Sequence, residues 1–156
     1  MKWVTRERPK IDRIACPWLI ARFIDADAEF LFVAAGEVAT VARETGATPF
    51  DVQGVELSHE GGRCSFDAFL ARYDFREPAL HDLATIVRGA DTARLDLAPE
   101  CAGLLAISLG LSRLMQDDQK QLEHGLVIYD ALFLWLKEGR GETHTWNPQS
   151  SVAMPG

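Results

Sequence analysis

The feature that most constrains the fold is a change in hydrophobic pattern near residues 74–78. Before it, short runs rich in aromatic and β-branched residues, at 2–6 and 29–34, alternate with amphipathic segments. After it, every apolar segment has helical spacing. We therefore expect an α/β fold leaning towards α+β, with a small β-containing N-terminal half packed on an all-helical C-terminal half. The predicted single domain spans residues 2–141, and residues 142–156 are expected to form a poorly ordered tail.

The first helix is predicted from apolar residues that recur with helical spacing between residues 11 and 23. Pro17 constrains where it begins, because proline is tolerated in a first turn but clashes with the preceding turn further inside. We favour a helix that begins near Cys16, and a helix kinked at Pro17 is the alternative.

The rest of the N-terminal half is predicted from its stop and start signals. A helix over 36–45 is expected to end at Gly46, and a capped helix is expected to start at Ser65. Between them the chain is rich in turn residues, with two possible short strands at 50–52 and 55–57.

The C-terminal half is predicted to consist of three helices. Pro78 starts the first, which is expected to end near Gly89 and to leave Asp91 in a turn. Pro99 starts the second, whose leucines surround most of its circumference, so we expect it to be central and buried. A last helix with a capping aspartate is predicted over 118–137.

Charge and composition exclude several classes of protein. The net charge of −7 argues against nucleic acid as a partner, because phosphate binding needs a basic face. The N-terminus lacks the apolar region of a signal peptide, and no apolar run reaches the roughly 20 residues that span a bilayer. The three cysteines lie far apart, which predicts neither disulfides nor a zinc ribbon. We expect a cytoplasmic protein without a membrane partner.

A glycine-rich loop holds the first candidates for a metal site. Glu56 and His59 lie three residues apart there and can reach one ion, although an exposed loop histidine is about equally compatible with the pattern. Further candidates are Asp91 and, on the last helix, Asp118 and Glu123. Such oxygen and nitrogen ligands suit iron, manganese or zinc. Helix capping is the alternative role for Asp91 and Asp118.

A second set of candidates is basic and suits a small anion. A helix beginning near Cys16 would place its thiol at a positive helix end, which lowers a thiol pKa and favours anions; a buried core cysteine is the alternative. A solvated basic end is likewise the alternative for the charged residues near the N-terminus. The candidate anion-binding residues are Arg6, Arg8, Lys10, Arg13, Cys16 and Arg88. No P-loop, dinucleotide fingerprint or Ser-His-Asp order is present, and no residue is assigned a catalytic role.

Seven segments, in order along the chain, carry a resemblance to a known family. They read WVTRERPKIDRIACPWLIARFID (3–25), DAEFLFV (27–33), PFDVQGVELSH (49–59), CSFDAFL (64–70), IVRGADTARLDLAPE (86–100), GLLAISLGLS (103–112) and LEHGLVIYDAL (122–132). Together they resemble the C-terminal domain of the chromate-resistance protein ChrB family over roughly residues 2–137.

The resemblance implies a role in chromate resistance. Full-length members of the family are regarded as chromate-responsive regulators with a DNA-binding N-terminal part, which we do not expect this chain to share. The motif positions that the resemblance singles out are occupied here by Arg13, Cys16, Glu56, His59, Cys64, Arg88 and Asp91. Gln119 departs from the histidine expected after the two aspartates.

Three functions remain open from the sequence. The leading hypothesis is a sensory or ligand-binding domain that holds chromate, a similar oxyanion or a metal ion. The second is a metal-dependent enzyme that uses the Glu56/His59 loop, with a redox-protective role as one option. The third is an interaction module that forms a homodimer through its apolar last helix.

Overall fold

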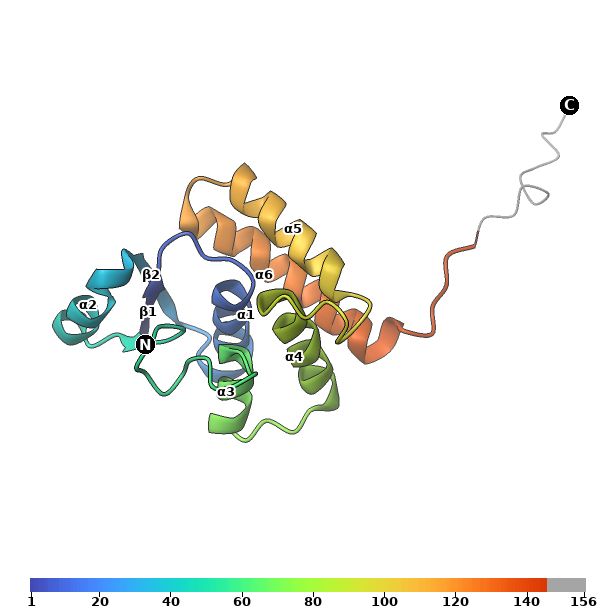
Figure 1. Cartoon of the computed structure of the whole chain (residues 1–156), viewed down its shortest axis with the longest axis horizontal. Coiled ribbons are helices and arrows are strands. Elements are labelled where there is room, and N and C mark those ends of the chain that lie inside the picture. Colours follow the sequence, from blue (N-terminus) through green and yellow to red (C-terminus); the bar gives the residue numbers. More distant parts are fainter. Residues whose placement is uncertain (146–156) are drawn as a thin grey trace, which may run out of the picture.

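The computed structural model describes residues 1–145, and residues 146–156, most of the predicted tail, lie outside the described part. A small parallel sheet lies at one end of the molecule and helices form the rest (Figure 1). The C-terminal half, from α4 (Pro78–Asp91) onward, contains helices joined by loops and no strand within the described residues. The predicted fold class is therefore confirmed.

The sheet has three parallel strands in the order β2-β1-β3. The central strand β1 (Lys2–Arg6) pairs with β2 (Glu29–Val33), and β3 (Thr48–Pro49) pairs with its other edge. Trp3 joins the main hydrophobic core, whereas Val4 packs with Val38 in a smaller cluster.

Helix α2 (Val38–Thr45), which follows the short 3-10 turn η2 (Ala35–Glu37), ends at Gly46 as predicted. The strands predicted at 50–52 and 55–57 are wrong. Asp51 has a positive φ of 49°, which turns the chain away from the sheet directly after Phe50 bonds to β1.

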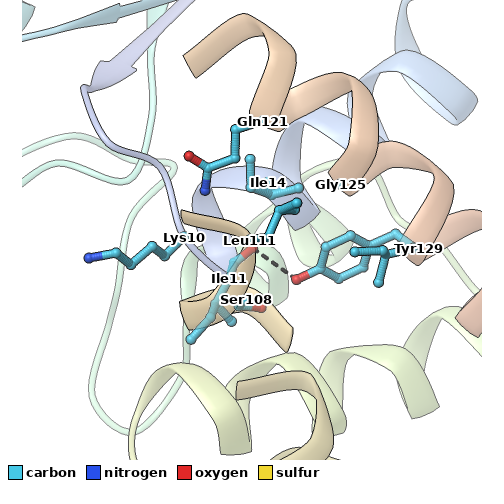
Figure 2. Close-up of a pocket in the computed structure, with 9 residues that line it drawn as sticks. Lys10, Ile11, Ile14, Ser108, Leu111, Gln121, Gly125 and Tyr129 are labelled. Carbon is cyan, nitrogen blue, oxygen red and sulfur yellow. Dashed lines mark hydrogen bonds between the residues drawn. The ribbon is translucent and has the colours of Figure 1, made fainter. Parts of the chain in front are cut away.

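Helix α1 (Asp12–Leu19) begins four residues earlier than predicted, so Pro17 lies inside it. The start is fixed at Ile11, whose carbonyl accepts hydrogen bonds from the backbone N–H groups of Ile14 and Ala15 and from the Tyr129 hydroxyl (Figure 2). These bonds form the first turn of the helix before Pro17 is reached. A π-helical turn, η1 (Ile20–Ile24), follows directly.

Helix α3 (Ser65–Arg72) starts at Ser65 as predicted, and Cys64 is the capping residue before it. The carboxylate of Asp67 closes the cap by accepting the Cys64 backbone N–H at 3.0 Å. Helix α4 ends at Asp91, two residues beyond Gly89, so Asp91 is the last residue of the helix and not a turn residue as predicted. A Cβ at Gly89 would lie 2.3 Å from Cys101 Sγ and 2.7 Å from the Arg94 carbonyl oxygen. Gly89 therefore serves close packing between helices, not helix termination.

The last two helices lie side by side at the outer edge of the molecule (Figure 1). Helix α5 (Cys101–Leu114) buries only one side, with Ile107, Leu109 and Leu114 exposed, so the prediction of a central, buried helix is wrong. Helix α6 (Asp118–Leu134) is capped by Asp117 as predicted and continues into the π-helical turn η3 (Trp135–Gly139).

An aromatic cluster joins the two halves of the chain. The centroid of the Trp18 ring in α1 lies 6.5 Å from the ring centroid of Phe66 in α3. It lies 6.3 Å and 5.4 Å from those of Tyr129 and Phe133, both in α6. These contacts belong to one main core that includes residues of β1, α1, α3, α4, α5 and α6. Within residues 1–145, no helix has both the length and the apolar character needed to cross a membrane.

We predict that Gly89→Ala lowers the free energy of unfolding by roughly 1–3 kcal/mol, as overpacking does, because the new methyl group meets a sulfur and a backbone oxygen. Chemical denaturation measures the change. Gly103→Ala in α5 is the matched control, because its new Cβ has no atom within 4 Å. Equal effects of the two substitutions would contradict the packing role of Gly89.

Candidate metal centre

Four polar side chains from three parts of the chain meet around one imidazole. Asp12 is the first residue of α1, and Asp91 is the last residue of α4. Asp51 and His59 lie in the loop between β3 and α3. The Nε2 atom of His59 lies 3.3 Å from Asp12 Oδ2, 3.2 Å from Asp51 Oδ1 and 3.0 Å from Asp91 Oδ2.

These separations match those between ligands on one metal ion. A single Nε2–H group donates well to one acceptor, yet three carboxylate oxygens surround it. With bonds of about 2.1 Å, neighbouring ligands lie about 3.0 Å apart in an octahedron and about 3.4 Å apart in a tetrahedron. Ligand atoms of Asp12, His59 and Asp91 all lie within 4.8 Å of one another. These three residues therefore fit a divalent cation bound by two oxygens and one nitrogen, and Asp51 lies beside them, 3.2 Å from the same nitrogen.

Asp12 is held by the start of α3. Its Oδ2 accepts the Ser65 backbone N–H at 2.7 Å, and its Oδ1 accepts the Phe66 backbone N–H at 3.0 Å. The preceding residue, Ile11, has a positive φ of 47°, which is rare for a β-branched residue. This strained backbone is bonded to Tyr129 and fixes the point from which Asp12 enters the cluster.

Asp51 divides its two oxygens between different partners. Oδ1 faces His59 and accepts the Ser65 hydroxyl at 2.7 Å, whereas Oδ2 lies 3.3 Å from the Arg6 guanidinium and 3.5 Å from that of Arg13. Such outer hydrogen bonds orient a ligand for the ion.

The cluster perturbs the acidity of its members. Burial, followed by the charges of Asp12 and Asp51, raises the pKa of Asp91 to about 7. Hydrogen bonds to Asp12 and Asp51 raise the pKa of His59 to about 10, although burial acts in the opposite direction. Burial also raises the pKa of Asp12. For Asp51 burial would raise the pKa, but the bonds from His59 and Ser65 and the charge of Arg6 outweigh it and lower the pKa.

The metal candidates from the sequence fall into two groups. His59 and Asp91 lie in the cluster. Glu56 forms a surface ion pair with Arg72, Asp118 binds Arg8, and Glu123 is exposed. Within residues 1–145, the cluster defined by its ligand atoms includes none of these last three acids.

Sequence reasoning missed Asp12 and Asp51. Asp12 lies before the helix start that was expected near Cys16 and among the basic residues of the N-terminus, and Asp51 was assigned to a possible strand. A signal for Asp51 was its place in a turn-rich segment directly after a strand, where side chains are free to bind.

The anion-binding candidates are mostly engaged with carboxylates of the protein itself. Arg6 and Arg13 face Asp51, as described, and the other two arginines have partners elsewhere. Arg8 lies 3.2 Å from Asp118, Arg88 lies 2.7 Å from Asp67, and Lys10 is exposed. Arg8 also donates to the backbone carbonyls of Ser112, Met115 and Gln116 at the end of α5.

Cys16 lies in the interior of α1 and is fully buried, so it has the core position considered as the alternative. Burial and the charge of Asp12 raise its pKa well above the ordinary thiol value. The same causes raise the pKa of Cys64. Neither thiol is therefore activated as a nucleophile.

Two cavities differ in what they can admit. One of about 300 Å³ adjoins the cluster and is lined by Arg6, Asp51, Val52, Gln53, Ser58 and His59. The other, between α1, α5 and α6, measures about 10 Å³ and holds at most one water molecule (Figure 2). Only the first has room for a small ligand beside the candidate metal centre.

The sequence matches the family described as "ChrB, C-terminal domain" over residues 3–136, which includes all four side chains of the cluster. The chain belongs to this family. It is 32% identical over 133 residues to "Protein ChrB" of Cupriavidus metallidurans. That match covers 85% of this chain but 40% of the ChrB protein, so the chain spans about two fifths of its relative's length. No solved structure matches it significantly.

We predict that the metal-free chain loses stability as the pH rises from 6.5 towards about 10. The pKa of His59 is raised from 6.5 to about 10, so the folded chain binds this proton more tightly than the unfolded chain does. Its contribution is complete below pH 6.5 and is lost as the pH passes through the folded-state pKa. Denaturant titrations in the presence of a chelator, at a series of pH values, measure the slope.

His59→Gln should flatten this slope, whereas His81→Gln, at an exposed histidine on α4, should leave it unchanged. An unaltered slope in His59→Gln would mean that the imidazole is not protonated among the carboxylates.

Proposed function

We propose that this chain is a ligand-binding domain of a chromate-resistance protein and that it holds a divalent transition-metal ion. The proposed ligands are Asp12, His59 and Asp91, with Asp51 beside His59, and the proposed ion is iron, manganese or zinc. Family membership supports the role in chromate resistance. The observation that carries the metal proposal is the convergence of three carboxylate oxygens on one imidazole nitrogen at 3.0–3.3 Å.

Charge favours a cation over an oxyanion in the middle of the cluster. Three carboxylates repel a dianion such as chromate, and Arg6 and Arg13, the nearest guanidinium groups, already face Asp51. The pKa of Asp91 is raised mainly by burial and secondly by the charges of Asp12 and Asp51, and the second cause also favours a cation. A divalent ion would compensate these charges.

A metal-dependent enzyme is the second candidate. The cavity of about 300 Å³ beside His59 and Asp51 favours it, because a catalytic metal needs an open side that a small molecule can reach. When bound, the ion would act as a Lewis acid towards such a molecule. The side chains of Arg6, Gln53 and Ser58 line the same space and would contact it.

We predict that the purified chain binds one equivalent of manganese, iron or zinc, and that His59→Ala and Asp91→Asn each lower the affinity at least about tenfold. Calorimetry on chelator-treated protein and elemental analysis measure the binding. Asp91→Asn is the sharper variant, because removing a carboxylate with a raised pKa relieves repulsion and is not expected to unfold the chain.

Glu56→Gln is the matched control, because Glu56 is an exposed acid of the same loop that pairs with Arg72. Its affinity should equal that of the unaltered chain. The proposal fails if no metal binds, or if Glu56→Gln weakens binding as much as Asp91→Asn does. A parallel titration with chromate and sulfate tests the oxyanion alternative.

A further inference from the structure

One face of α5 is apolar and exposed. The exposed fractions are 53% for Ile107 and 72% for Leu114, which lie seven residues apart and therefore on the same side of the helix. The opposite side of the helix is buried through Cys101, Leu104, Ser108 and Ser112, which face the rest of the domain. In a chain with a net charge of −7, the outward positions 102–114 carry a single charged residue, Arg113. Such a face on a charged protein is typical of an interaction surface.

Two glycines, Gly103 and Gly110, lie on this outer face, and no contact within the described residues requires glycine at either position. Gly103 and Gly110 are in regular helix, and a Cβ at either position would have no atom within 4 Å among the described residues. Glycine destabilises a helix interior relative to alanine. Both positions would accept a side chain in the isolated chain, so packing among the described residues does not require either glycine, and both leave room for the close approach of a second helix.

The face is complementary to itself in an antiparallel arrangement. Glu100, Gly103, Ile107, Gly110 and Leu114 follow the alternating spacing of three and four residues that places them on one side of a helix. In a pairing centred between Ala106 and Ile107, Gly103 of one copy lies opposite Gly110 of the other. The same register places Glu100 opposite Arg113.

The two charges are available for such a pairing. Neither the Glu100 nor the Arg113 side chain forms an ion pair within residues 1–145. A two-fold axis creates both Glu100–Arg113 contacts at once, one at each end of the glycine-lined stretch. A parallel pairing would instead bring like charges together, which disfavours it.

We propose that α5 is a homodimer interface, in which it packs antiparallel against α5 of a second copy of this chain. The pairing buries Ile107 and Leu114, uses Gly103 and Gly110 for close contact between the helices, and joins Glu100 to Arg113 of the partner. A single pair of helices of 14 residues gives an interface at the small end of the usual range, so the dissociation constant is expected to be roughly micromolar. None of these residues belongs to the metal cluster, and the proposal is independent of it.

A charge exchange tests both the dimer and its register. Sedimentation equilibrium over a series of protein concentrations measures the dissociation constant of the unaltered chain, Glu100→Arg, Arg113→Glu and the double variant. Each single change places like charges opposite one another twice and should weaken the dimer about tenfold or more. The double variant restores opposite charges and should return the constant to within about threefold of the original.

Gly110→Gln is the steric variant. It replaces a glycine with a better helix former where the isolated chain has room, so the monomer should be at least as stable while the dimer is lost. A chain that stays monomeric at millimolar concentration overturns the proposal and assigns the face to another protein. A dimer whose constant ignores the single charge changes, or is not rescued by the double variant, also overturns it.

Discussion

Asp12 begins α1 with a buried carboxylate, and both of its oxygens accept backbone N–H groups from the first residues of α3. A buried carboxylate is costly unless it is hydrogen-bonded, and the start of a helix offers unpaired donors and a favourable dipole. This contact joins positions more than 50 residues apart. Ser65 also connects Asp51 to this contact, because its hydroxyl donates to Asp51 Oδ1 at 2.7 Å. The start of α3 therefore holds two of the three carboxylates that surround His59.

The energetic character of that centre follows from its charges. Three carboxylates surround one imidazole, and the pKa of one of them, Asp91, is raised to about 7. Strained backbone at Ile11 and Asp51 adds to the cost. Clusters of buried ionisable groups with perturbed pKa values are typical of functional sites. A divalent cation bound there would offset the repulsion between the carboxylates, which adds to the cost of their burial.

The sequence predicts which segments form strands and helices better than it predicts where some of them begin and end. Strands 2–6 and 29–33, the stop at Gly46 and the cap at Asp117 follow from local signals that the structure retains. The errors arise where tertiary contacts override local preference. Tyr129 helps fix the start of α1 before Pro17, and close packing on Cys101 explains Gly89. For the site, His59 and Asp91 were singled out. Asp12 and Asp51 were not, because their role depends on contacts with Ser65 and Phe66 that no local pattern encodes.

The contact between Gly89 and Cys101 also joins the end of α4 to the start of α5. Asp91 lies two residues beyond Gly89, at the end of α4, and α5 begins at Cys101. Because a Cβ at Gly89 would already overlap the cysteine sulfur, the two helices meet without slack. The end of α4, which carries Asp91, and the first turn of α5 are therefore in direct contact. A substitution that moved either of these helix ends would also displace the other.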